Sequence, residues 1–101
     1  MSYTGFIHIN DNYDFNDTGN DGYNLYIVDI SSNKTITLPS YPWSGQTYYI
    51  TRKDSNILNT CTIDAGSNTI DGSSTKNLPA STESYVIFDN GDWIFTKYLI
   101  N

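Results

Sequence analysis

Turn-forming residues recur about every ten residues along this chain, and the short stretches between them alternate apolar and polar side chains. This spacing is typical of an all-β sandwich or barrel. No window of useful length shows the helical period of about 3.6 residues, so we expect no helix beyond a turn or two. The predicted strands are residues 4–9, 24–30, 34–38, 46–52, 60–64, 68–71, 84–89 and 92–100.

The size and composition of the chain agree with this prediction. Its 101 residues correspond to one domain of ordinary size. Aromatic side chains make up 15% of the chain, and they fit the pleated surface of a sheet better than a helix. We therefore expect a single domain, residues 1–101, folded as a compact antiparallel β-sandwich or barrel of about eight short strands.

The clearest local prediction is a hairpin near the end of the chain. The dipeptide Asn90-Gly91 lies between two apolar runs and suits a type I′ turn, which needs a positive φ at both central residues. The predicted cross-strand pairs are Phe88 with Trp93, Ile87 with Ile94 and Val86 with Phe95.

Both faces of this hairpin are apolar, whereas a lone antiparallel sheet normally has one polar face. One face can pack on the core of the domain, and the other can pack on a second subunit. The alternative is that loops of the same domain wrap the hairpin. The residues expected in a subunit interface or in the core are Tyr85, Ile87, Trp93, Ile94 and Phe95.

The net charge of −6 argues against nucleic acid or an anionic membrane as a partner, because both are negatively charged. Four of the acidic residues lie in segment 10–22, NDNYDFNDTGNDG. This segment lacks the Glu that an EF-hand calcium loop carries at its twelfth position; the two possible frames place Val28 or Leu25 there. We expect a solvated surface loop, close to a subunit boundary or to a receptor-binding face.

Catalytic machinery is not evident in the sequence. His8 is the only histidine, and no nucleophile-elbow serine, zinc-ligand spacing or phosphate-binding glycine loop accompanies it. Cys61 is the only cysteine, and its place in a predicted strand indicates a small buried hydrophobic residue. We predict a protein without enzymatic activity, with no catalytic residue, metal or cofactor.

Aromatic residues in loops are the best candidates for binding a receptor. Sugars stack on aromatic faces and bond to Asn and Asp, so a glycan is one option. Tyr41 and Trp43 lie in the segment LPSYPWSGQ, and Tyr13 and Phe15 lie in the acidic segment. For Trp43, the alternative is a structural role in capping the open end of a small sandwich.

Three segments follow one another in a characteristic order: YIVDISSNKTITLPSYPWSGQTYYITRKDSN, TCTIDAGSNTIDGSS and ESYVIFDNGDWIF. Together they resemble C-terminal domains of phage tail fibres and fibre-head proteins of DNA viruses, including viruses of algae. The resemblance covers about Tyr23 to Phe95. Its positions are Ile36, Leu38, Pro39, Gly45, Tyr48, Ile50, Thr62, Ile63, Ile70, Asp71, Gly72, Asn90, Gly91 and Trp93.

The resemblance implies an all-β homotrimer at the tip of a virion fibre, where it attaches the virus to a receptor on the host-cell surface. It implies no catalytic motif, and it places receptor contacts on variable loops. Residues 1–22 lie outside the resemblance, and a junction with a preceding shaft is one interpretation of them. The first residues lack the features of a signal peptide, so we expect synthesis inside the host cell. Two alternatives remain, a monomeric carbohydrate-binding module and a purely structural decoration protein of the virion.

Overall fold

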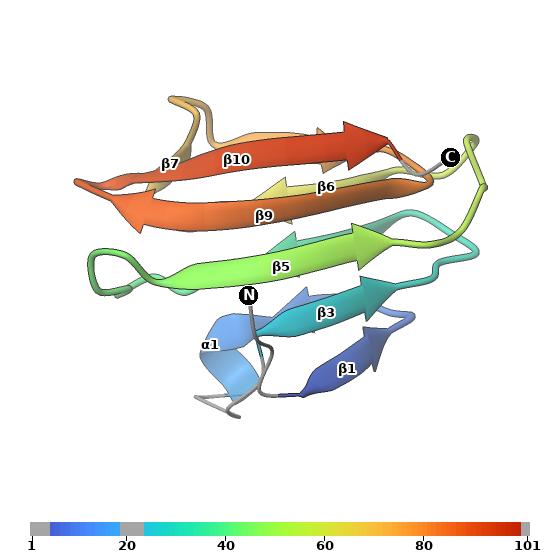
Figure 1. Cartoon of the computed structure of the whole chain (residues 1–101), viewed down its shortest axis with the longest axis horizontal. Coiled ribbons are helices and arrows are strands. Elements are labelled where there is room, and N and C mark those ends of the chain that lie inside the picture. Colours follow the sequence, from blue (N-terminus) through green and yellow to red (C-terminus); the bar gives the residue numbers. More distant parts are fainter. Residues whose placement is uncertain (1–4, 19–23, 100–101) are drawn as a thin grey trace.

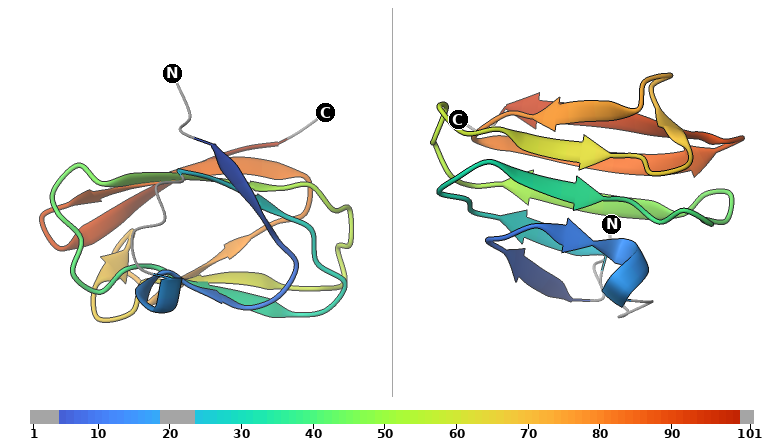
Figure 2. Two further views of the ribbon diagram at one scale, coloured as in Figure 1. Left: turned by 90° about the horizontal axis from the view of Figure 1, so that it is seen from below. Right: turned by 180° about the vertical axis from the view of Figure 1, so that it is seen from behind.

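In residues 5–18 and 24–99, the computed structural model of the protein has ten strands and one turn of helix (Figure 1). The elements are β1 (Phe6–Ile9), β2 (Tyr13–Asp14), α1 (Phe15–Thr18), β3 (Leu25–Val28), β4 (Lys34–Thr37), β5 (Thr47–Arg52), β6 (Cys61–Asp64), β7 (Thr69–Ile70), β8 (Thr75–Leu78), β9 (Thr82–Asp89) and β10 (Asp92–Leu99). One sheet has the order β1-β3-β5-β9-β10-β7 and the other has the order β2-β4-β6-β8. The two sheets face each other (Figure 2), and the predicted all-β class is confirmed.

The first six strands alternate between the two sheets, so that β1 with β2, β3 with β4, and β5 with β6 each form one coil of the chain. Each strand is parallel to its counterpart in the next coil. The arrangement resembles a β-solenoid. The predicted antiparallel sandwich is therefore wrong for this half of the molecule, because alternating apolar residues fit a parallel neighbour as well as an antiparallel one.

The remaining strands close the stack with antiparallel pairs. The chain turns back after β7, where Asp71 and Gly72 adopt positive φ angles of 49° and 79°. β8 then runs antiparallel to β6, and β9 runs antiparallel to β5. The β9–β10 hairpin has the three cross-strand pairs predicted from the sequence. Its turn residues Asn90 and Gly91 have φ angles of 51° and 84°, as a type I′ turn requires.

The acidic segment differs most from its prediction. Residues 13–18 form β2 and α1 as part of the first coil, while residues 19–23 lie outside the described residues. Asp11 pairs with Lys34 at 2.9 Å, and the Asp14 carboxylate accepts a hydrogen bond from the backbone N–H of Asn16. β8 is a further strand that the sequence did not predict.

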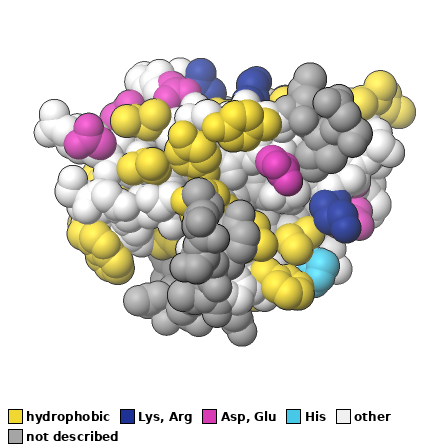
Figure 3. Space-filling model, in the orientation of Figure 1, with side chains coloured by type: hydrophobic (Ala, Val, Ile, Leu, Met, Phe, Trp, Pro, Cys, Tyr) yellow, Lys and Arg dark blue, Asp and Glu magenta, His cyan; other side chains and the backbone are white. Residues whose placement is uncertain are grey.

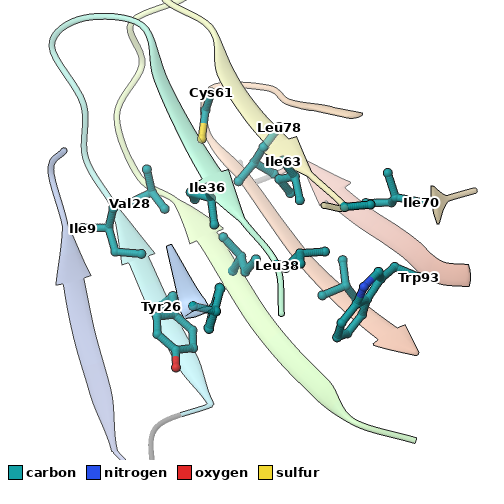
Figure 4. Close-up of a cluster of buried hydrophobic side chains, with 14 of the residues drawn as sticks. Ile9, Tyr26, Val28, Ile36, Leu38, Cys61, Ile63, Ile70, Leu78 and Trp93 are labelled. Atoms are coloured by element: carbon teal, nitrogen blue, oxygen red, sulfur yellow. The ribbon is translucent and has the colours of Figure 1, made fainter. Parts of the chain in front are cut away.

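The core lies between the two sheets and takes apolar side chains from every coil (Figure 4). Ile36, Leu38 and Ile63 are fully buried, and Trp93 closes the cluster from β10. Each buried aliphatic side chain of this kind contributes about 1.5–3 kcal/mol to folding. Cys61 is also fully buried, as predicted, and burial raises the pKa of its thiol to about 11.

The coils turn at two opposite edges of the molecule. The Arg52 edge, on the right in Figure 1, comprises the turns 10–12, 29–33 and 53–60. The aromatic edge, on the left, comprises the loop 38–46 and the hairpin tip 89–92.

Candidate functional site

The loop 38–46 on the aromatic edge is held by hydrogen bonds at both of its ends. At its C-terminal end, the N–H of Trp43 donates to the side-chain oxygen of Gln46, and the N–H of Gln46 donates to the C=O of Trp43, both at 3.1 Å. Gly45, at a φ of 88°, donates its N–H to the C=O of Phe88 at 2.8 Å. The N–H of Phe88 donates a second hydrogen bond between these segments, to the C=O of Gln46 at 3.0 Å. The end of the loop is therefore fixed to β9.

At the other end of the loop, two asparagine side chains hold the backbone of Ser40. The side-chain oxygen of Asn16, in α1, accepts the N–H of Ser40 at 2.9 Å. The same side chain donates its amide to the C=O of Leu38 at 3.2 Å. Asn68, in the turn after β6, donates to the C=O of Ser40 at 3.1 Å. This loop is thus tied to the coil before it and to the coil after it.

Between these two anchors the loop exposes two aromatic side chains. Tyr41 is 94% exposed and Trp43 is 65% exposed. A large aromatic side chain on a fixed backbone supplies contact area at a low cost in conformational entropy, because the backbone is already ordered before binding. Together with their sequence neighbours Ser40 and Ser44, Tyr41 and Trp43 form the candidate binding site.

Two carboxylates at the aromatic edge accept hydrogen bonds that hold its turns. Asp92 accepts hydrogen bonds from the Thr69 hydroxyl at 2.7 Å and the Gly72 N–H at 3.0 Å, and these bonds lower the pKa of Asp92. Asp64 accepts the N–H of Gly66 at 2.8 Å. The lowered pKa makes Asp92 poorly suited to acid–base chemistry, which needs a pKa near the working pH.

No group of three or more His, Cys, Asp or Glu side chains that could hold a metal ion occurs in residues 5–18 and 24–99. His8 is exposed on the outer side of β1, where its ring meets that of Phe6 edge-on with centroids 5.6 Å apart. His8 thus lies in a strand, as the sequence predicts.

A second candidate surface is the outer side of the six-stranded sheet, here called the outer face. The strand registers place a set of apolar side chains on it, comprising Phe6, Leu25, Tyr49, Tyr85, Ile87, Ile94 and Tyr98. Phe6 is 56% exposed, Ile94 45% and Tyr98 55%. The rings of Tyr49 and Tyr85 lie 5.9 Å apart. Figure 3 shows hydrophobic side chains spread over this side of the molecule, and patches of this kind often mark an interaction site.

The predicted interface residues separate by face. Tyr85, Ile87 and Ile94 lie on the outer face, whereas Trp93 is fully buried and Phe95 packs against the core from the inner side. The structure thus gives the hairpin the two apolar faces inferred from its sequence.

Tyr13 and Phe15 do not belong to an exposed binding surface. Phe15 is 4% exposed and Tyr13 is half-buried, and their rings are 5.1 Å apart in contact with the core. Tyr13 at the start of β2 and Phe15 at the start of α1 thus both pack on the core. The prediction of a receptor contact at Phe15 is inconsistent with this burial.

Sequence reasoning missed the polar cluster at the Arg52 edge. Arg52 is 1% exposed and forms an ion pair with Asp54, with 3.0 Å between the guanidinium and the carboxylate. Its other hydrogen bonds go to the C=O groups of Leu78, Asn56 and Asn59. Side chains alternate along β5, so Arg52 points to the same inner side as Tyr48 and Ile50. This alternation was the signal in the sequence that Arg52 is buried.

The comparisons with known proteins leave the family open, since no family model and no curated protein matches this chain. Within the described residues, no helix has the length and apolarity needed to cross a membrane.

Proposed function

We propose that this chain is the head domain of a viral or phage fibre, which attaches the virion to a host-cell receptor as a homotrimer. The observation that carries the attachment role is the pair Tyr41 and Trp43, exposed on a loop whose backbone is fixed at both ends. A glycan is the receptor chemistry that this site fits best, because sugars bind to aromatic faces with polar groups beside them.

The outer face supports the oligomeric part of the proposal. It offers aromatic and aliphatic side chains on a wide sheet, which is the composition of subunit interfaces between stable partners. Packing three copies through this face would cover the apolar side of the hairpin and leave the aromatic edge at the periphery of the assembly.

The attachment role is tested with a glycan array and with binding to host cells. The double substitution Tyr41→Ala and Trp43→Ala should weaken binding about tenfold or more, since aromatic anchors dominate binding energy. A matched control is the double substitution Ile57→Ala and Leu58→Ala, which removes side chains that are 85% and 89% exposed on the opposite edge. Equal loss of binding in both double variants would contradict the proposed site.

The homotrimer is tested by sedimentation of the purified protein at micromolar concentration. Ile87→Lys and Ile94→Lys place charges on the outer face and should convert the trimer to a monomer. Leu58→Lys, on the Arg52 edge, is the control and should leave the trimer intact. A wild-type monomer that binds glycans would instead support a carbohydrate-binding module, and a wild-type trimer that binds neither cells nor glycans would support a decoration protein.

A further inference from the structure

β1, in the first coil, is an edge strand of the six-stranded sheet. β1 pairs with β3 alone within the described residues, and it forms the lower margin of that sheet in Figure 1. The C=O of Ile9 accepts the N–H of Asp29 at 2.9 Å, so the backbone groups of Ile9 point toward β3. Backbone groups of successive residues in a strand point to opposite sides. The N–H and C=O groups of Phe6 and His8 therefore point to the open side.

The two ends of the stack differ in how their edges are protected. At the far end, β7 has only two residues, and β8 carries Lys76 and stops just before Pro79. Short length, lysine and proline are the usual means of preventing another strand from pairing with an edge. β1 has the sequence Phe-Ile-His-Ile and none of these features. Its edge is consequently suited to accept a further strand.

A hollow of about 530 Å³ lies where β1 ends, between the turns of the first and second coils. Its lining residues are His8, Ile9, Asn10, Asp29, Ile30 and Ser31. Ile9 and Ile30 are almost completely buried and form its base, while the polar residues are exposed around its rim. A strand added to β1 would place a side chain near this hollow, and peptides added to sheet edges obtain their specificity from such pockets.

The charge at this end indicates what kind of strand would fit. Residues 5–18 contain three aspartates and neither Lys nor Arg. Lys34 already pairs with Asp11, whereas Asp29 stands exposed at the rim of the hollow. We propose that the open edge of β1 binds an extended, basic segment of a partner protein, which adds as a further strand and places a Lys or Arg side chain beside Asp29. This inference does not depend on the proposed attachment function.

The test uses the whole chain and a short fluorescein-labelled peptide in which Lys and Val alternate, with binding measured by fluorescence anisotropy at low salt. His8→Pro removes a backbone N–H from the open side and leaves the hydrogen bonds between β1 and β3 in place. It should weaken binding about tenfold, and His8→Thr, which keeps the N–H, should bind within about twofold of the wild type. Asp29→Asn should weaken binding about threefold.

Two further measurements separate strand addition from other modes of binding. The same peptide with N-methyl groups on alternate residues cannot pair along an edge, so it should lose binding to the unaltered protein. A peptide that alternates Glu and Val should bind more weakly than the Lys peptide. Equal binding of the N-methylated or the Glu peptide would overturn the proposal. Loss of self-association in His8→Pro would also overturn it, because a second copy of this chain would then occupy the edge.

Discussion

The turns at the two edges of this molecule are held by different kinds of polar side chain. At the Arg52 edge, a guanidinium is buried and its hydrogen bonds hold the loop 53–60 from within. At the aromatic edge, neutral asparagine side chains hold the loop 38–46 from neighbouring turns. Removing the partner of a buried charge lowers the free energy of unfolding strongly, whereas removing one neutral hydrogen bond lowers it only a little. We therefore expect stability to depend on the Arg52 edge and recognition to depend on the aromatic edge.

Among changes at the two edges, Arg52→Met should have the largest effect on stability. This change leaves the Asp54 carboxylate, 7% exposed, without its cation and removes the donors to three backbone carbonyls. Unfolding in urea should show a loss of about 3–5 kcal/mol, the usual cost of breaking a buried ion pair. Lys53→Met, at the exposed neighbouring position, should change stability by less than about 0.5 kcal/mol. Similar losses in both variants would remove the contrast between the two edges.

The same ion pair makes stability depend on pH. Burial alone would raise the pKa of Asp54, but hydrogen bonds from Arg52, Ile30 and Asn56 outweigh it and hold the pKa below its ordinary value of 3.8. A lowered pKa in the folded state stabilises the protein fully above the unfolded-state pKa, and this contribution is lost as the pH falls toward the folded-state pKa.

Urea midpoints of the wild type should accordingly decline below about pH 4. Asp54→Asn should be less stable than the wild type at neutral pH, and this difference should narrow as the pH falls. A difference that stays constant from neutral to acidic pH would show that the charge of Asp54 contributes nothing.

The parts of this fold that could be predicted are those decided by neighbouring residues. The register of the last hairpin follows from Asn90-Gly91, since the turn itself fixes which residues face each other. Inward and outward positions along β9 and β10 follow from alternation within each strand. The exposure of Tyr41 and Trp43 also follows locally, from a loop that contains two prolines and a glycine.

The pairing of the coils could not be predicted in this way. Equivalent positions on successive strands of the larger sheet are Phe6, Leu25 and Tyr49, so the first spacing is 25 − 6 = 19 residues and the second is 49 − 25 = 24. Without a constant repeat length, the sequence carries no periodic sign of a solenoid. The full set of Arg52 partners was hidden for a related reason, since Leu78 lies 26 residues further along the chain and only the fold brings it to Arg52.

A smaller effect is expected at the aromatic edge from Asn16→Ala and Asn68→Ala. Asn68→Ala removes one hydrogen bond to the backbone of Ser40, and Asn16→Ala removes the bonds to Ser40 and Leu38; each lost bond should cost about 1 kcal/mol. Hydrogen exchange should become faster within residues 40–46, because the loop loses one of its anchors. Asn77→Ala, at an exposed position of β8, serves as the control and should leave exchange in the loop unchanged. Unchanged exchange in the two loop variants would show that the asparagines do not order this site.

The smallest effect on stability should come from removing the two exposed aromatic side chains. Tyr41→Ala and Trp43→Ala should each change the free energy of unfolding by less than about 0.5 kcal/mol, because neither side chain is packed against the core. Phe15→Ala removes a buried aromatic side chain and should cost about 3–5 kcal/mol. A loss above about 1 kcal/mol in Trp43→Ala would favour the structural alternative, in which Trp43 caps the open end between the two sheets. Retained stability with lost glycan binding would assign both aromatic side chains to recognition.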